Sequence, residues 1–244
     1  MFALGDFAPG QITISVQEAR RSRMTSESYV KPSGMGDETR SEMLPLRRRL
    51  GHAALRLVGW QLDVSTPLPP RCVLVGAHHT SSSDFYLGML LLWATGIRIR
   101  WAAKDTLFWG PLGLIMRGLG GVPINRRQRT GFVSRMAAAM EAADEFRLAI
   151  LPEGTRRRAD HWKTGFYHIA ELARVPIFFA YADYERRVIG WAPGIVPTGD
   201  IDADFAVIRA FYAHVRPRYP ALRGEVRPKP AAEHTPANGS PNHM

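Results

Sequence analysis

The sequence predicts a single α/β domain, in which helices flank a mixed, largely parallel β-sheet and an amphipathic helix comes first. Three observations predict this fold class. The length of 244 residues and the hydrophobic content of 45% suit one domain with a core of ordinary size. Strand-like and helical segments alternate between residues 72 and 215, which is typical of parallel sheets. Polar residues follow one strand-like segment after another.

The composition of the two ends sets the expected domain boundaries. Residues 1–42 mix Ser, Gly and charged residues without periodicity, and residues 225–244 are polar and rich in Pro, Ala and Asn. We therefore expect a flexible leader over 1–42, the domain over 43–224 and a disordered tail over 225–244. Asp6 interrupts the first apolar residues, so we expect no export signal.

The elements follow from hydrophobic periodicity. Leucines and alanines at helical spacing over residues 44–60, with arginines on the other faces, predict a basic amphipathic helix that either packs on the core or lies in a lipid interface. The segments expected next are, in chain order, strand 72–77, helix 84–95, strand 97–104, a broken helix over 107–119, strand 121–125, a helix with the apolar face Val133, Met136, Met140 and Phe146, strand 148–154, helix 164–173, strand 175–183, a strand near 186–193 and a helix from about 202 to 215.

Charge and cysteine content limit the possible functions. A net charge of +10 predicts attraction to phosphate-rich partners, which include nucleic acid, anionic lipid and phosphorylated substrates. The longest uncharged run, 85–97, has 13 residues, and a membrane span needs about 20, so any membrane contact is expected to be peripheral. The single cysteine, Cys72, excludes an internal disulfide and lies in an apolar strand pattern, where it reads as a small buried hydrophobe.

The expected site lies where polar residues follow the strands. "AHHTSSSD" follows the first predicted strand of the sheet, Lys104 the next, "NRR" the third and "PEGTR" the fourth. In open parallel sheets, ligands bind outside the carboxyl ends of the strands. Four such segments in succession predict a binding or catalytic site at that edge.

His79 and Asp84 are the candidate catalytic pair. The Ser-x-x-Asp sequence from Ser81 to Asp84 is a capping box, in which Ser81 would accept a hydrogen bond from the Asp84 amide. Capping explains Asp84 but not the histidine five residues earlier. A carboxylate that holds one ring nitrogen of His79 would fix the tautomer and stabilise the imidazolium, as a general base requires.

These residues carry a family resemblance. His79 and Asp84 form the His-x-x-x-x-Asp signature of the glycerolipid acyltransferase family, whose members acylate glycerol 3-phosphate and lysophosphatidic acid. "GGVPINR" (120–126), "LPEGTR" (151–156) and "VPI" (175–177) resemble the family's other blocks, in the expected order. The resemblance covers roughly residues 70–215 and implies a PlsC-like domain.

The resemblance implies roles for single residues. His79 would deprotonate the acceptor hydroxyl and Asp84 would orient it. The phosphate of the acceptor would be bound by Asn125 and Arg126, with Lys104 as a second cation. The block that would hold the glycerol backbone and support the first histidine comprises Glu153, Gly154, Thr155 and Arg156.

The resemblance also implies substrates and a location. The acyl donor would be acyl-CoA or an acyl carrier protein thioester, with no other cofactor and no metal. The acceptor would be a lysophospholipid or glycerol phosphate, in phospholipid biosynthesis. We expect a cytoplasmic protein bound peripherally to the anionic inner face of the cell membrane. The helix near 44–60 and the apolar segment "LFWGPLGLIM" (107–116) would attach it.

The sequence departs from the family pattern at some positions. His78 stands beside His79, so either ring could in principle be the base, although the spacing to Asp84 favours His79. The fourth block lacks the proline expected two residues after "VPI". A metal site of His78, His79 and Glu153 is conceivable, although no His-Glu-x-x-His spacing exists.

Two rival functions compete with the enzyme interpretation. The first is a basic protein that binds nucleic acid or an anionic surface without catalysis, but the sequence has no Cys/His zinc pattern and no RNP-type aromatic block. We therefore expect no nucleic-acid partner. The second is a serine hydrolase, but the sequence contains no Gly-x-Ser-x-Gly elbow.

Overall fold

A seven-stranded sheet forms the centre of the computed structural model, which describes residues 37–124 and 131–229, with side chains from residue 46 onward. The strand order is β1–β7–β6–β2–β5–β3–β4, and every neighbouring pair is parallel except β6 and β7. The predicted mixed, largely parallel sheet is thereby confirmed. The strands are β1 (Gln61–Asp63), β2 (Arg71–Gly76), β3 (Arg100–Lys104), β4 (Gly121–Ile124), β5 (Phe146–Ile150), β6 (Ile177–Asp183) and β7 (Val188–Ile195).

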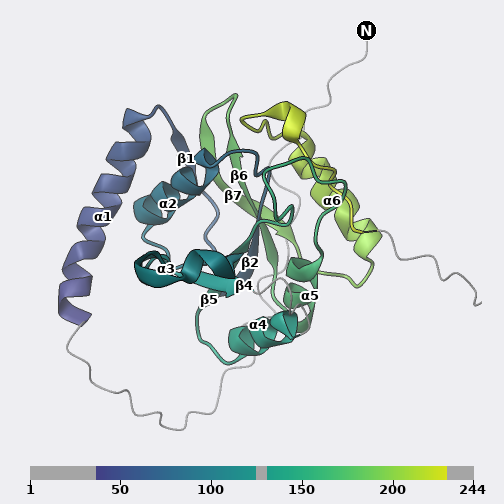
Figure 1. Ribbon diagram of the computed structural model, residues 1–244, viewed down its shortest axis with the longest axis horizontal. Helices are drawn as coiled ribbons and strands as arrows, with labels where there is room; N and C mark the ends of the chain where they lie inside the picture. Colours follow the sequence, from purple (N-terminus) through teal and green to yellow (C-terminus); the bar gives the residue numbers. More distant parts are fainter. Residues whose placement is uncertain (1–36, 125–130, 230–244) are drawn as a thin grey trace, which may run out of the picture. The chain divides into compact units, whose positions relative to one another are not determined.

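Helices cover both faces of the sheet (Figure 1). They are α1 (Asp37–Leu57), α2 (Ser83–Thr95), α3 (Gly110–Gly118), α4 (Phe132–Glu141), α5 (Gly165–Leu172) and α6 (Ile201–Ala213), with the 3-10 turns η2 (Asp105–Phe108) and η3 (Pro220–Leu222). From Thr39 onward these elements belong to one unit. In β2, Val73 and Val75 enter the core shared with α4, α5 and α6, whereas Cys72 and Leu74 enter the core shared with α1 and α2. The alternation along one strand shows that β2 is buried on both faces.

The amphipathic helix α1 packs on α2 along one stripe only. Gly51 lies so close to α2 that a Cβ atom there would come within 2.4 Å of the Ala94 nitrogen. Leu55 is buried against the core, while Leu50 and Leu57 are exposed. The helix therefore packs on the core with one stripe and presents apolar side chains to the outside with another.

Some elements differ from the sequence expectations. Phe146 does not extend the face of α4 but begins β5, where it is buried in the core with Leu148. β1 was not expected, because three residues are too short to show a strand period. β7 runs antiparallel to β6, as a hairpin partner.

The two expected domain boundaries also differ from the structure. α1 begins at Asp37, inside the segment expected as leader. Val226 packs in the core, beyond the expected start of the tail at residue 225. The rest of the expected leader and tail lies outside the described residues. Of the helices that the structure describes, none has the length and hydropathy to cross a bilayer.

Candidate active site

The motif loops meet at one edge of the sheet because β2 and β5 are parallel neighbours. Val75 of β2 pairs with Ile150 of β5, so the loop that begins at Ala77 lies beside the loop that begins at Leu151. The first loop carries His78 and His79 and leads into α2. Parallel pairing therefore brings together two motifs that lie about 75 residues apart in the sequence.

His79 and Asp84 form the expected pair. Nδ1 of His79 lies 3.1 Å from Oδ2 of Asp84, and the histidine side chain is 16% exposed. The same oxygen accepts hydrogen bonds from the backbone amides of Thr80 and Ser81, at 3.0 and 2.9 Å. A carboxylate at Nδ1 favours the tautomer with the proton on that nitrogen, which leaves Nε2 as the basic atom. The pair is thus arranged for proton transfer at Nε2.

Hydrogen bonds keep Asp84 ionised in spite of its burial. Burial alone would raise the pKa of Asp84, but hydrogen bonds from His79, Tyr184 and the Ser81 amide outweigh it and hold the pKa below its ordinary value. A negative charge on Asp84 stabilises the imidazolium that forms when His79 takes up a proton.

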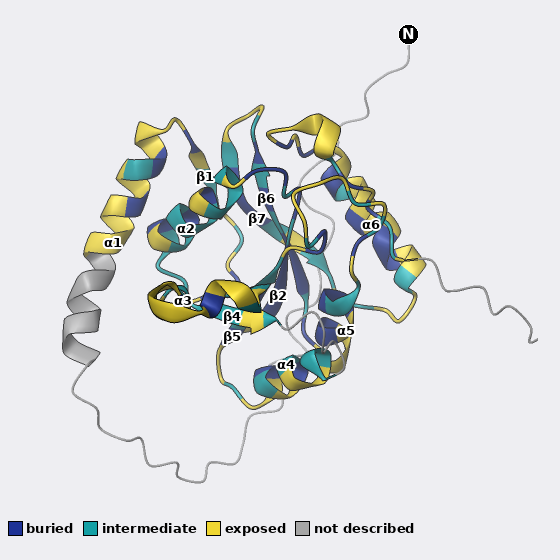
Figure 2. Ribbon diagram, viewed as in Figure 1, coloured by how far each residue is buried: buried dark blue, intermediate teal, exposed yellow. Residues whose placement is uncertain are grey.

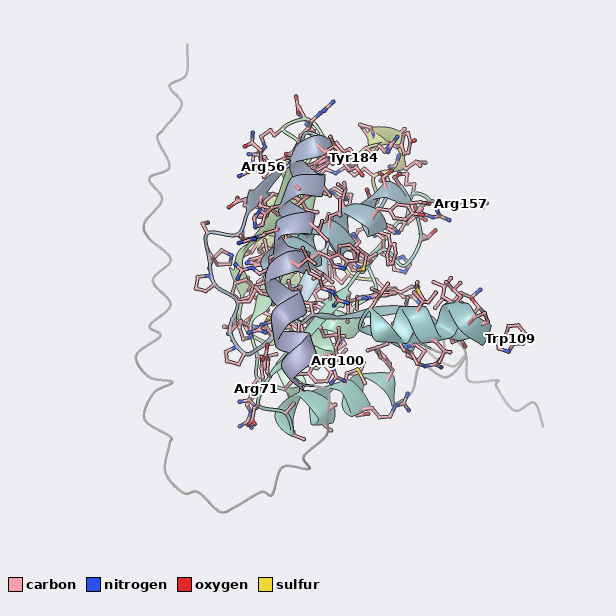
Figure 3. All side chains as sticks on the ribbon, turned by 90° about the vertical axis from the view of Figure 1, so that its left-hand side faces the viewer. Arg56, Arg71, Arg100, Trp109, Arg157 and Tyr184 are labelled. Carbon is pink, nitrogen blue, oxygen red and sulfur yellow. The ribbon has the colours of Figure 1, made fainter. Side chains whose placement is uncertain are left out.

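Tyr184 is a site residue that the sequence reasoning missed. Its hydroxyl donates a hydrogen bond to Oδ1 of Asp84 at 2.5 Å, and its ring packs edge-on against Trp60 with 4.9 Å between centroids. Burial, followed by the bond to Asp84, raises the pKa of Tyr184, so the hydroxyl stays protonated as a donor. Tyr184 directly follows β6, at the same edge of the sheet (Figure 3). The rule that polar residues follow the strands could have identified it.

His78 faces the interior of the protein. Its side chain is fully buried, Nδ1 lies 3.0 Å from Oε1 of Glu153, and its ring packs against Tyr212. Nε2 of His78 is buried and has no hydrogen-bond partner among the described residues. A substrate hydroxyl in solvent cannot reach it. The geometry therefore supports His79, the ring that the spacing to Asp84 favoured.

Glu153 contacts both His78 and His79 from the interior of the protein. Oε2 accepts a hydrogen bond from the His79 amide at 3.1 Å, while Oε1 faces His78, and the carboxylate is almost fully buried. Both carboxylate oxygens are therefore engaged inside the protein. The next residue, Gly154, has φ of +63°, a left-handed conformation that favours glycine in this turn.

Two arginines from distant segments fasten the start of α2. Nη1 of Arg156 donates to Oγ of Ser82, and Nη1 of Arg218 donates to Oγ of Ser83. The capping box is formed only in half. The Asp84 carboxylate accepts from the Ser81 amide, but Oγ of Ser81 accepts from the Ser83 amide, and not from that of Asp84. Arg218 was not expected from the sequence.

The remaining predicted residues are only partly located. Lys104 ends β3 and is exposed, two strand positions from β2. Thr155 is exposed, and its hydroxyl accepts a hydrogen bond from the Arg157 amide. Asn125 and Arg126 lie outside the described residues. No group of three His, Cys, Asp or Glu side chains in the described ranges is placed to hold a metal ion, so the site considered for His78, His79 and Glu153 is not assembled.

Comparison with known proteins finds similarity to acyltransferases. Residues 62–180 match the family model described as Acyltransferase. Over 112 residues the chain is 35% identical to the 1-acyl-sn-glycerol-3-phosphate acyltransferase beta of Homo sapiens, and the match covers 43% of this chain and 39% of the human protein. The chain thus spans about two fifths of the length of this curated relative.

The fold is that of a solved acyltransferase. The crystal structure of the 1-acyl-sn-glycerophosphate (LPA) acyltransferase PlsC from Thermotoga maritima matches with a TM-score of 0.51, over 71% of this chain and 78% of that chain, at 15% sequence identity. This identity establishes the fold alone. The fold and the family model that matches residues 62–180 both support a resemblance of this chain to PlsC-like glycerolipid acyltransferases.

Proposed function

We propose that the protein is an O-acyltransferase of phospholipid biosynthesis, which moves a fatty acyl group from a thioester to a hydroxyl of a lysophospholipid or glycerol phosphate. The observation that carries this proposal is the contact of 3.1 Å between His79 Nδ1 and Asp84 Oδ2. The acyl donor is a thioester of coenzyme A or of an acyl carrier protein, and no other cofactor takes part.

The reaction follows from the orientation of the His79 ring. Nε2 takes the proton of the acceptor hydroxyl while the hydroxyl oxygen attacks the thioester carbonyl, so that a C–O bond forms and a tetrahedral intermediate results. Collapse of the intermediate breaks the C–S bond, and the imidazolium returns the proton to the leaving thiolate. The products are an ester and a free thiol, without an acyl-enzyme. General-base assistance of this kind contributes about 10² to 10⁴ in rate.

The cationic side chain of Lys104, at the same edge of the sheet, supports a phosphate-bearing acceptor. Lys104 lies two strand positions from β2, which corresponds to about 10 Å at ordinary strand spacing. We assign the acceptor phosphate to Lys104, Asn125 and Arg126, and the glycerol to the loop of Gly154, Thr155 and Arg156. Lysophosphatidic acid is the first candidate acceptor, because the human relative is named for 1-acyl-sn-glycerol 3-phosphate.

An acyl-transfer assay tests the proposed function. Purified protein is incubated with labelled acyl-CoA or acyl-acyl carrier protein and with lysophosphatidic acid, glycerol 3-phosphate or lysophosphatidylcholine. We expect transfer by the wild type and a loss of about 10² or more in His79→Ala. The control is His168→Ala, which removes an exposed histidine on α5. Equal turnover by His79→Ala and the wild type would exclude the proposed base. Steeply salt-dependent DNA binding without any acyl transfer would instead support a nucleic-acid-binding protein.

We also propose that η2 and α3 attach the protein to the inner face of the cell membrane. The apolar side chains exposed on this segment are Leu107, Trp109, Leu112, Leu114 and Ile115. Figure 2 shows the exposed surface of α3, and Figure 3 shows Trp109 at its far end, away from the sheet. Trp and Leu beside cationic side chains such as Arg117 suit an interface with anionic lipid, and the net charge of +10 adds attraction to that leaflet.

Vesicle flotation tests the membrane proposal. The double variant Trp109→Ser with Leu114→Ser is compared with Leu172→Ser, which changes a half-exposed leucine on α5. On vesicles that contain phosphatidylglycerol, we expect the double variant to bind at least about tenfold more weakly than the wild type, because each buried apolar side chain contributes about 1.5–3 kcal/mol. Leu172→Ser should bind like the wild type. Equal flotation of all three proteins would refute this attachment.

A further inference from the structure

A pocket lined by arginines lies apart from the His79–Asp84 pair. A surface pocket of about 430 Å³ opens between the loop after β5 and the segment that follows η3. Its charged lining consists of Arg158, Arg209, Arg223, Glu225 and Arg227. Four guanidinium groups against one carboxylate give this lining, here called the arginine pocket, a net charge of +3.

Neutral backbone oxygens hold two of these guanidinium groups in place. Nε of Arg209 donates to the Val226 carbonyl oxygen at 2.9 Å, and Nη2 of Arg223 donates to the Tyr212 carbonyl oxygen at 3.0 Å. Among the described residues, no carboxylate lies within ion-pair distance of either group. Their position is thus fixed while their charge is not neutralised. Each guanidinium also keeps further N–H donors for a ligand.

Glu225 neutralises only part of the remaining charge. Its carboxylate accepts a hydrogen bond from Nε of Arg227 at 2.8 Å and lies 3.8 Å from Nη2 of Arg158, and all three side chains are substantially exposed. One carboxylate shared by two guanidinium groups leaves a positive charge there as well. Basic surface clusters are usually just solvated, but here the arginines surround a concave pocket, which suits a ligand with several phosphate groups.

Both segments that line the pocket also contact the start of α2, next to the loop that carries His79. Arg156, which bonds Ser82, precedes Arg158 by two residues, so their Cα atoms are at most about 7.6 Å apart. Arg218, which bonds Ser83, lies five residues before Arg223. The Glu225 amide donates to the Ala159 carbonyl oxygen at 2.9 Å and joins the two segments. Figure 1 shows the segment after η3 beside α6. The pocket therefore adjoins the proposed active site and is separate from it.

We propose that the arginine pocket binds the phosphate groups at the nucleotide end of coenzyme A. This inference rests on the acyltransferase function proposed above. An acyl-CoA carries a diphosphate and a 3′-phosphate at the far end of a flexible pantetheine arm, so its anionic end must bind at a distance from the reacting carbonyl. The charged lining holds no histidine, cysteine or lysine, so the pocket is suited to binding the donor and not to chemistry. Four guanidinium groups with a net charge of +3 complement the three phosphate groups.

Donors with and without phosphates test the inference. The variants are Arg158→Gln and the double variant Arg209→Gln with Arg223→Gln. The control is Arg71→Gln, which removes another exposed arginine that donates to a backbone carbonyl oxygen, at the opposite end of β2 from His79 (Figure 3). We expect the KM for acyl-CoA to rise about tenfold or more in the double variant, and by a smaller factor in Arg158→Gln. The KM and kcat for the matching acyl-pantetheine, which has no phosphate, should not change.

Direct binding keeps the test independent of the proposed activity. Adenosine 3′,5′-bisphosphate should bind the wild type and Arg71→Gln in calorimetry, and should bind both pocket variants more weakly. If the wild type transfers no acyl group but binds this nucleotide through the pocket, the proposed function fails and the pocket assignment stands. If transfer proceeds and the pocket variants keep the KM for acyl-CoA and the affinity for the nucleotide, the pocket assignment fails alone. A KM that rises for acyl-acyl carrier protein and not for acyl-CoA would also overturn it. Arg158→Gln, whose side chain bonds no backbone atom in the described structure, covers the case in which the double variant does not fold.

Discussion

Tyr184 and His79 hold opposite oxygens of the same carboxylate. The Tyr184 hydroxyl donates to Oδ1 of Asp84 at 2.5 Å, and Nδ1 of His79 lies 3.1 Å from Oδ2. Asp84 is therefore fixed from both sides, and the orientation of the His79 ring depends on a residue that follows another strand. Tyr184 acts on the ring through Asp84, as a positioning residue.

The first prediction concerns Tyr184→Phe. Because a hydrogen bond to a charged group contributes about 1.5–3 kcal/mol, we expect kcat to fall by about tenfold while the KM of both substrates stays unchanged. One cause of the low pKa of Asp84 is removed, so that pKa should rise toward its ordinary value. The NMR titration of the Asp84 carboxylate should then move to higher pH. Tyr86→Phe, at an exposed tyrosine of α2, is the matched control. An unchanged titration of Asp84 in Tyr184→Phe would contradict the positioning role.

The lowered pKa of Asp84 gives a second prediction, on stability. A carboxyl group whose pKa is lower in the folded than in the unfolded protein stabilises the folded state above its unfolded-state pKa, and this contribution is lost as the pH falls through the folded pKa. The ordinary value is 3.8, and folding lowers it. The Tm of the wild type should therefore exceed that of Asp84→Asn at pH 6, and the difference should shrink as the pH falls below about 4. Thermal unfolding followed by circular dichroism from pH 3 to 7 measures this. A difference that stays constant over this range would count against the linkage.

The sequence predicts the edge of the sheet at which the site forms better than it predicts the contacts there. Polar residues after strands identify His79, Asp84 and Glu153, because parallel strands bring their carboxyl ends to one edge. The Tyr184–Asp84 bond joins residues 100 positions apart, and it depends on β6 lying next to β2. Strand order is not written in local periodicity, so this contact was not predictable.

The same limit applies to His78 and to α1. Neighbouring residues of an extended chain point in opposite directions, but only the buried Glu153 carboxylate decides which histidine turns inward. The amphipathic pattern of α1 fits both packing and lipid contact, and the structure shows a buried Leu55 beside an exposed Leu57. Local patterns thus specify elements and candidate residues, whereas tertiary packing assigns the faces.

A third prediction concerns the single thiol. Cys72 is fully buried, and burial raises its pKa to about 12. At pH 8 the thiolate fraction is then on the order of one in ten thousand, and the reagent has no access. A thiol reagent such as DTNB should leave the native protein unlabelled and should react with one thiol per chain after unfolding in guanidinium chloride. Rapid labelling of the native protein would show that β2 is less well buried than the structure indicates.

The last prediction separates the two neighbouring histidines. In His78→Ala the buried Glu153 carboxylate loses a hydrogen-bond partner, and leaving a buried charged acceptor without a partner costs about 3 kcal/mol. At about 2–4 °C per kcal/mol for a domain of this size, we expect the Tm to fall by about 10 °C. The kcat of the folded fraction should fall by less than about tenfold, because His79 and Asp84 remain. His79→Ala should show the opposite pattern, with a Tm close to that of the wild type and a kcat reduced by about 10² to 10⁴. Calorimetry and acyl-transfer assays on the same preparations measure both quantities. If His78→Ala were the variant with normal stability and no turnover, His78 would be the base, and Glu153 would be the carboxylate that orients it.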